Sequence, residues 1–177
     1  MYESQPWTAQ DRFVAESLNF QKNGFFVDIG CHHYKDISNT YFLESQLGWR
    51  GVGIDIDNKH KQGWQEYRQN STFICTDATQ ANYQLILDQC NAPKIIEYLS
   101  VDIEPPHNTL LALQKILETD YIFKIITFET DSYQGDLTPR DVSRQLLPEK
   151  GYKFIKEASQ DDFWYHTSFT PTNINTP

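Results

Sequence analysis

The stretch Phe25-Phe26-Val27-Asp28-Ile29-Gly30 decides the fold. A short apolar run with aromatic and β-branched residues that ends at a glycine is typical of a buried strand followed by a sharp turn. Four similar runs follow it along the chain, at 52–55, 73–75, 95–101 and 125–128. We therefore expect five strands between residues 25 and 128.

Helical patterns separate these predicted strands. Apolar residues recur at helical spacing in two stripes, Tyr83, Ile86, Leu87 and Cys90, and then Leu110, Leu113 and Leu117. A further helix is predicted to start at Thr138, which we expect to cap it, with Pro139 in the first helical position. Strands that alternate with helices are typical of βαβ units, so the pattern predicts an α/β fold with a mostly parallel sheet and helices on both faces.

The two ends of the chain extend this core. Residues 152–156 and 163–166 are predicted to form an antiparallel hairpin at the edge of the sheet, and residues 8–20 an additional helix. We expect a single domain over 1–177, because 177 residues suit one hydrophobic core and no linker interrupts the pattern. Within it, 1–22 is an N-terminal helical extension and 170–177 a flexible, polar tail.

Composition restricts the partners and the compartment. The formal charge of −9 disfavours nucleic acid, because proteins that bind phosphate backbones concentrate Lys and Arg on one face. We find no signal segment or apolar run that could span a bilayer, so no membrane partner is expected. The cysteines Cys31, Cys75 and Cys90 form no C-x-x-C pair and are interpreted as reduced thiols of a cytoplasmic protein. The oligomeric state cannot be read from the sequence.

Acidic residues follow three successive predicted strands. In an open parallel sheet, ligands bind beyond the carboxyl ends of the strands. Asp28 and Gly30 end the first strand, Asp55 ends the second, and Asp77 follows the third. Asp55 can accept hydrogen bonds from both hydroxyls of a ribose, and Asp77 from an adenine amino group. Each acid alone also suits a solvated loop or a helix cap; their order along the chain favours an adenosine-containing ligand.

A nicotinamide dinucleotide shares the ribose and must be weighed. Its fingerprint G-x-G-x-x-G is absent, because Gly30 is followed by Cys31-His32-His33-Tyr34. S-adenosylmethionine (SAM) has no pyrophosphate to accommodate, and an acidic pocket would stabilise its sulfonium charge. The strand ends therefore favour SAM over NAD.

Several motifs resemble, in order and spacing, those of the FkbM-type SAM-dependent methyltransferases. They are FVDIG at 26–30, SNTY at 38–41, GWRG at 48–51, YLSVDIE at 98–104 and ITFE at 126–129, the last followed by Asp131 and Tyr133. The resemblance extends from about residue 5 to about residue 166. It implies a class I methyltransferase (Rossmann-like) fold, with seven strands in the order 3-2-1-4-5-7-6 and the last reversed, and O-methylation as the usual activity. One departure is Tyr34, where many relatives carry a second glycine.

The resemblance also implies the cofactor contacts. It assigns SAM to Asp28, Gly30, Asp55 and Asp77, and the predicted binding set extends to Cys31, Asn39, Ile56 and Ala78. The acceptor would be a hydroxyl of a small molecule or glycan.

Removal of the acceptor's proton requires a base or a cation. Asp102 and Glu104 end the fourth strand and Glu129 and Asp131 the fifth, so the topology predicts up to four carboxylates beside the acceptor. Asp102, Glu104 and Glu129 are the predicted catalytic residues, together with His33 as an alternative base. Because clustered carboxylates repel one another, Asp102, Glu129 and Asp131 are also candidate ligands of Mg²⁺. Helix capping by Glu104 and Asp131 is the simpler interpretation of those two.

Three functions remain open on the sequence alone. The leading one is a SAM-dependent O-methyltransferase. The alternatives are a catalytically silent module that binds SAM or a nucleoside, and a nicotinamide oxidoreductase.

Overall fold

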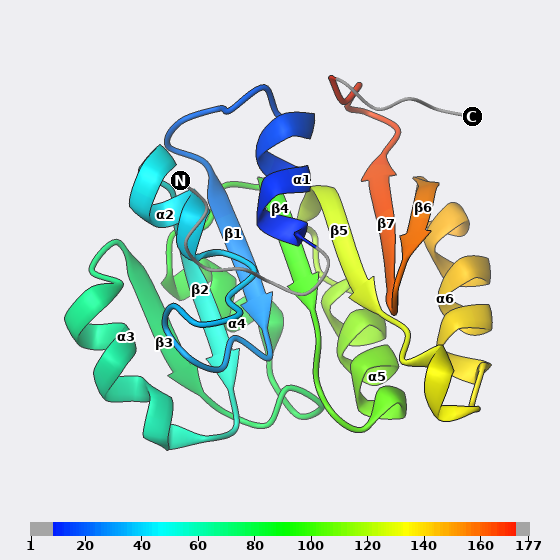
Figure 1. Ribbon diagram of the computed structural model, residues 1–177, viewed down its shortest axis with the longest axis horizontal. Coiled ribbons are helices and arrows are strands. Elements are labelled where there is room, and N and C mark those ends of the chain that lie inside the picture. The colour runs from blue at the N-terminus through cyan, green and yellow to red at the C-terminus, as the bar shows by residue number, and fades with distance from the viewer. Residues whose placement is uncertain (1–8, 173–177) are drawn as a thin grey trace.

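The computed structural model describes residues 9–172. Within them, seven strands form one sheet in the order β3-β2-β1-β4-β5-β7-β6 (Figure 1). The strands are β1 (Phe25–Ile29), β2 (Arg50–Asp55), β3 (Ser71–Cys75), β4 (Ile95–Val101), β5 (Ile122–Glu129), β6 (Tyr152–Ala158) and β7 (Asp161–His166). The pairings of β7 with β5 and with β6 are antiparallel, and the other pairings are parallel. The predicted strand order and the reversed last strand are confirmed.

Helices cover both faces of this sheet. They are α1 (Gln10–Ser17), α2 (Tyr41–Leu47), α3 (Lys61–Tyr67), α4 (Tyr83–Gln89), α5 (Pro106–Ile116) and α6 (Thr138–Glu149). In Figure 1, α1 lies in front of the sheet and α4 behind it. One core cluster joins α4, α5 and α6 to one face, and a second joins α1, α2 and α3 to the other.

The first strand shows why the core has two halves. Side chains alternate along a strand, so Phe25, Val27 and Ile29 belong to the cluster with α4 to α6, whereas Phe26 belongs to the cluster with α1 to α3. All five residues of β1 are buried. This central strand is therefore fixed from both sides, and its carboxyl end is a rigid base for the loop that follows.

The observed boundaries differ from the predicted ones in a few places. Strand β2 begins at Arg50 and β5 at Ile122, each before the predicted start. The predicted cap of α6 is wrong: Thr138 is already helical, and its N–H donates to the Asp136 carboxylate at 2.9 Å. Asp136 is the better acceptor, because a carboxylate bonds an N–H two residues ahead more strongly than a hydroxyl does.

The ends of the chain are described only in part. Helix α1 lies inside the predicted 8–20 helix, while the remainder of the predicted extension at 1–8 and most of the predicted tail, at 173–177, lie outside the described residues. Thr172 donates its N–H to the Ser17 carbonyl at 2.9 Å, which joins the two ends. No helix within residues 9–172 has both the length and the apolar character needed to cross a membrane.

Candidate functional site

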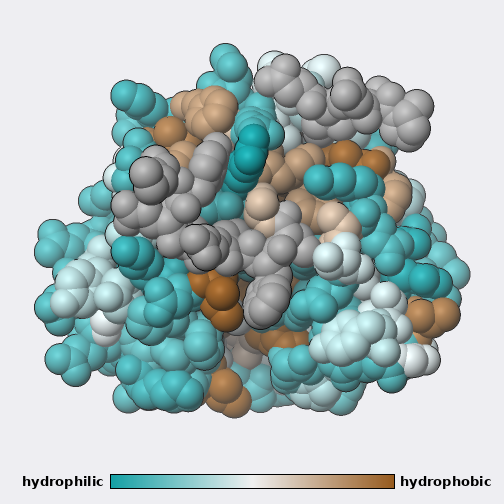
Figure 2. All heavy atoms as spheres, in the orientation of Figure 1, coloured by the Kyte–Doolittle hydropathy of each residue, from teal (hydrophilic) through white to brown (hydrophobic). Residues whose placement is uncertain are grey.

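A cavity of about 400 Å³ lies where the carboxyl ends of β1 to β4 meet, at the lower edge of the sheet in Figure 1. All eight residues of the predicted cofactor set line it: Asp28, Gly30, Cys31, Asn39, Asp55, Ile56, Asp77 and Ala78. Asp102 and Glu104 line it as well. Figure 2 shows hydrophobic atoms at the lower middle of this face between hydrophilic ones. The size and the mixed lining are those of a small-molecule site.

Gly30 lines the cavity and forms the tight turn that follows β1. Its φ of +86° is a left-handed value that glycine adopts readily, and a Cβ at this position would lie 1.7 Å from the Asp102 carbonyl oxygen. Its N–H donates to the Ile54 carbonyl at 2.8 Å. The turn therefore joins the ends of β1, β2 and β4 without space for a side chain.

Backbone groups hold Asp55 in place. Its two carboxylate oxygens accept the N–H groups of His32 and Asp57, both at 2.8 Å. Each carboxylate oxygen has two lone pairs, so the group can still accept two hydroxyl hydrogen bonds from a ligand. Ile56, which is 73% exposed, follows it on the cavity wall and offers an apolar surface.

A local turn holds Asp77 in place, in keeping with the alternative that this residue has a structural role in a loop. Its Oδ1 accepts both the N–H and the hydroxyl of Thr79, at 2.8 and 2.7 Å. The carboxylate remains exposed and lines the cavity. A structural turn and a ligand contact are therefore compatible at this residue.

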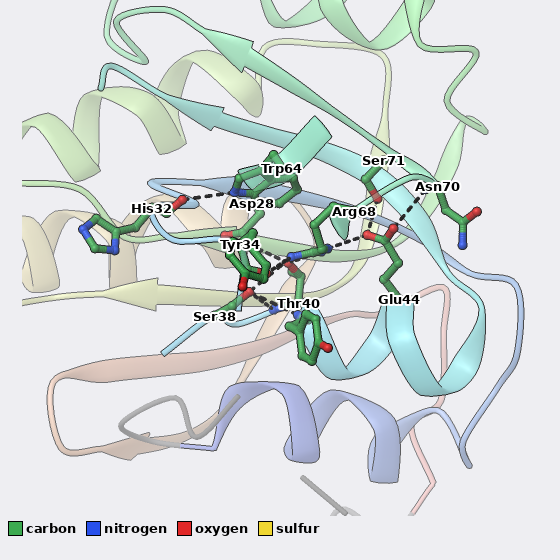
Figure 3. Close-up of polar contacts among 11 residues, drawn as sticks. Asp28, His32, Tyr34, Ser38, Thr40, Glu44, Trp64, Arg68, Asn70 and Ser71 are labelled. Carbon is green, nitrogen blue, oxygen red and sulfur yellow. Dashed lines mark hydrogen bonds and ion pairs between the residues drawn. The ribbon is translucent and has the colours of Figure 1, made fainter. Parts of the chain in front are cut away.

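Asp28 is buried beneath the cavity and connects to Arg68 through Thr40 (Figure 3). The Thr40 hydroxyl donates to Asp28 at 2.7 Å and accepts from Arg68 Nη2 at 3.0 Å. Burial raises the pKa of Asp28 to about 6, although the Thr40 hydrogen bond and the Arg68 charge act in the opposite direction. Asp28 can therefore exchange a proton near neutral pH.

Arg68 anchors the loop that closes one side of the cavity (Figure 3). Its guanidinium pairs with Glu44 at 2.6 Å, and both side chains are almost completely buried. It also donates to the Tyr34 carbonyl at 3.0 Å, and its guanidinium lies 4.1 Å from the centroid of the Trp64 ring. The Tyr34 ring stacks on Tyr67 and does not line the cavity, so this departure from the family pattern lies outside the pocket.

Two other predicted contacts form the floor of the cavity. Asn39 donates to the Ser100 hydroxyl at 3.0 Å, which fixes its side chain against β4. The Cys31 thiol is buried, and burial raises its pKa well above the ordinary value, so it stays protonated. Cys31 thus contributes an apolar wall.

The predicted carboxylates converge, in two layers. Asp102 and Glu104 line the cavity, and Glu129 lies behind them, buried and hydrogen-bonded to Asp102. Burial and the neighbouring Asp102 raise the pKa of Glu129 far above its ordinary value. The raised pKa favours the protonated form of Glu129, which can donate a hydrogen bond to Asp102.

Asp131 completes the cluster. It is 1% exposed, and Tyr133 and Glu129 are its polar neighbours. Burial, together with Glu104 and Asp102, raises its pKa to about 6.

Two predictions about the chemistry gain no support from this geometry. The structure does not arrange Asp102, Glu129 and Asp131 as metal ligands, and no group of three or more His, Cys, Asp or Glu side chains within residues 9–172 is placed to hold a metal ion. The proton between Glu129 and Asp102 reduces the repulsion that motivated the metal. His33 does not line the cavity, because its Nδ1 accepts the N–H of Asp36 at 3.0 Å in a local turn, and His32 lines the wall instead.

Comparison with known proteins identifies the architecture. No protein-family model and no curated protein matches the sequence. Among solved structures, a TDP-rhamnose 3'-O-methyltransferase of calicheamicin biosynthesis is similar, with a TM-score of 0.63, 14% identity, and coverage of 88% of this chain and 76% of that one. An rRNA methylase from Streptococcus thermophilus has a TM-score of 0.52 and 16% identity, with coverage of 87% and 90%.

A third similar structure is named for a different reaction. The 4+2 cyclase SpnF has a TM-score of 0.53 and 13% identity, with coverage of 82% of this chain and 58% of that one. Because the names of these structures include both methyltransferases and a cyclase, the fold alone does not fix the reaction. The resemblance to the FkbM type stays a prediction. This chain adopts the Rossmann-like fold of class I methyltransferases.

Proposed function

We propose that this protein is a SAM-dependent methyltransferase that acts on a hydroxyl of a small molecule or glycan. The observation that carries the proposal is that acidic side chains from three neighbouring strand ends surround one cavity. Asp28 and Asp55 lie at the carboxyl ends of β1 and β2, Asp77 follows β3, and all three line the same space. Most of the solved structures with this fold named above are methyltransferases, one of them a sugar O-methyltransferase.

The residues present fit the cofactor. Asp55 would accept the ribose hydroxyls, Asp77 the adenine amino group, and Ile56 would cover the base with its exposed side chain. Asp28 would stabilise the cationic methionine end. SAM supplies a methyl group on a sulfonium, an electrophile that a hydroxyl oxygen can attack once its proton is removed.

We assign Asp102 as the base that removes this proton. It faces the cavity, whereas Glu129 lies behind it and donates a hydrogen bond to it. This arrangement fixes the orientation of Asp102 and leaves its carboxylate available as a general base. Glu104 lines the same wall and would contact the acceptor.

Calorimetry tests the proposal directly. We expect SAM and its demethylated product S-adenosylhomocysteine (SAH) to bind with one site per chain and NAD to show no binding, because no glycine-rich loop accommodates a pyrophosphate. SAM binding followed by SAH formation with members of a sugar and natural-product hydroxyl panel supports the enzyme. Binding with no transfer to any acceptor supports the silent module, and NAD binding stronger than SAM binding supports the oxidoreductase.

A further inference from the structure

The Thr40 hydroxyl lies between a buried arginine and a carboxylate of the cavity (Figure 3). It donates to Asp28 Oδ2 at 2.7 Å and accepts from Arg68 Nη2 at 3.0 Å. A guanidinium has only donors, so Thr40 must accept from Arg68, and its own hydrogen is available to Asp28. The chemistry of the three groups therefore fixes the direction of both hydrogen bonds, and they form a relay from Arg68 to Asp28.

Ser38, rather than Thr40, caps the helix that follows. Thr40 occupies the N-cap position of α2, where a threonine commonly accepts an N–H with its side chain. Within the part of the chain that the structure describes, its hydroxyl makes no such bond. Ser38 Oγ instead accepts the N–H groups of Thr40 and Tyr41, at 3.3 and 3.1 Å. The buried hydroxyl of Thr40 is thus left for Asp28.

The relay opposes the effect of burial on Asp28. This carboxyl is 1% exposed, and burial favours its neutral form, whereas a hydrogen bond donated to the carboxylate favours the charged form. Both the Thr40 hydrogen bond and the Arg68 charge lower the pKa of Asp28 against burial. Arg68 pairs directly with Glu44 at 2.6 Å, so its hydrogen-bonded route to Asp28 leads through Thr40.

The other titratable groups that act on Asp28 do not stabilise its charge. Two are carboxyls, which repel it, and two are neutral groups whose pKa burial raises well above the ordinary value. They are Asp55 of β2, Asp102 after β4, the Cys31 thiol and the Tyr98 phenol. Among the groups within residues 9–172 that act on Asp28, Arg68 is the cation.

The relay also determines which oxygen is left for a ligand. Thr40 bonds to Oδ2, and Asp28 lines the cavity, so Oδ1 keeps both of its lone pairs for a bound cation. We propose that Thr40, oriented by Arg68, is a positioning residue of the cofactor site, and that its hydroxyl keeps the Asp28 carboxylate ionised with Oδ1 available to the cationic methionine end of SAM. The inference rests on the proposed function for its ligand, whereas the relay itself belongs to the chain.

NMR of the ligand-free protein tests the relay. Carbon-13 in the Asp carboxyl groups reports their ionisation, and Asp28→Asn assigns the signal of Asp28. We expect Thr40→Val, which keeps the branched shape and removes the hydroxyl, to raise the ionisation midpoint of Asp28 by about one pH unit. Thr40→Ser should keep the wild-type midpoint, because it retains the donor. Thr127→Val removes another buried hydroxyl, which bonds to Tyr98 at 2.7 Å, and should leave the midpoint unchanged.

The pH dependence of SAM binding separates positioning from packing. If the midpoint moves by about one pH unit, Thr40→Val should bind SAM about five- to tenfold more weakly than the wild type at pH 5.5, and about twofold more weakly or less at pH 8. A merely structural defect weakens binding by the same factor at both pH values. Thr40→Ser should follow the wild type throughout.

The outcomes distinguish this proposal from the proposed function. The role of the hydroxyl is overturned by an Asp28 midpoint that Thr40→Val leaves unchanged, by a loss of SAM affinity that does not vary with pH, or by a Thr40→Ser protein that behaves like Thr40→Val. If Thr40→Val does not fold, Thr40→Ala takes its place with the same expected midpoint. A wild type that binds neither SAM nor SAH counts against the proposed function, and the NMR titration of the ligand-free protein then decides the relay.

Discussion

The backbone of Gly30 packs against the carbonyl of Asp102 so closely that a Cβ on Gly30 would lie 1.7 Å from that oxygen. This contact joins the cofactor loop after β1 to the proposed base after β4. A side chain at residue 30 would have to separate the two strand ends, so its effect reaches both parts of the site.

Gly30→Ala is therefore expected to destabilise the whole fold, by about 2 to 5 kcal/mol, from the left-handed φ and the overpacking together. Urea denaturation measures this loss. Gly135→Ala is the matched control, because Gly135 has a φ of +93° and a Cβ there would meet no described atom within 4 Å; it should cost only about 1 to 2 kcal/mol. Equal losses in the two variants would show that the contact with Asp102 adds nothing.

Asp55→Ala is expected to weaken SAM binding by roughly 1.5 to 3 kcal/mol, the scale for hydrogen bonds to a charged group. The reason is that Asp55 lines the cavity with its oxygens held by two backbone N–H groups. Asp57→Ala removes the same charge two residues away and outside the cavity lining, so calorimetry should find SAM affinity nearly unchanged in that variant. Unchanged affinity in a folded Asp55→Ala protein would contradict the ribose assignment.

SAM affinity should also depend on pH through Asp28. The pKa of this carboxyl is raised to about 6, so at pH 5 most of the free protein carries a proton there that a cationic ligand must displace. Affinity should rise about tenfold from pH 5 to pH 7, because one proton is released on binding below the pKa. Calorimetry in buffers of different ionisation enthalpy measures that proton. Asp28→Asn should bind more weakly at pH 7 and without this pH dependence; a flat profile in the wild type rejects the assignment.

The sequence predicts the strand ends well, because apolar runs and turn residues are local signals and a parallel sheet brings their carboxyl ends together. All eight predicted cofactor residues line one cavity for this reason. The layering of Asp102 in front of Glu129 was not predictable, because both follow strands in the same way and only side-chain packing separates them. The turn that uses His33 Nδ1 was not predictable either, because a loop histidine gives no local sign of such a hydrogen bond.

The Glu44 and Arg68 pair was missed entirely. The two residues are 24 positions apart, and neither belongs to a motif that suggests a partner. Helix α2, which carries Glu44, was not predicted either. Only the tertiary arrangement brings α2 and the end of α3 together beneath the loop at 34–40, so no local pattern could have revealed the network in Figure 3.

Arg68→Met is expected to destabilise the protein by about 3 to 5 kcal/mol, because it leaves Glu44 as a buried carboxylate without its cation. Arg12→Met provides the control: Arg12 and Glu16 form an exposed i, i+4 pair, and such pairs contribute about 0.5 kcal/mol or less. Chemical denaturation compares the two. A double variant, Arg68→Met with Glu44→Leu, should recover part of the loss, and a loss no larger than that of Arg12→Met would contradict the proposed role of the pair.

A metal-dependent mechanism and a carboxylate base differ in their response to chelation. Once an acceptor is known, excess EDTA should leave turnover unchanged if Asp102 acts as the base, because that mechanism uses only groups of the chain. Loss of turnover that Mg²⁺ or Mn²⁺ restores would instead support a cation at the carboxylates. The measurement is SAH formation, and SAH binding in the same buffers controls for an effect on the cofactor site.

Asp102 and Glu129 should respond differently when each is replaced by its amide. Asp102→Asn removes the carboxylate that faces the cavity, so kcat is expected to fall by about 10² to 10⁴, the usual contribution of a general base. Glu129→Gln replaces a carboxyl that is already protonated with an amide that can still donate a hydrogen bond to Asp102, so kcat should fall by only about tenfold or less. Both variants should bind SAH with wild-type affinity, which shows that the fold and the cofactor site are intact. A larger loss in Glu129→Gln than in Asp102→Asn would place the base at Glu129. Full turnover of both would remove the carboxylate pair from the mechanism, because neither carboxylate would then be needed to accept the proton.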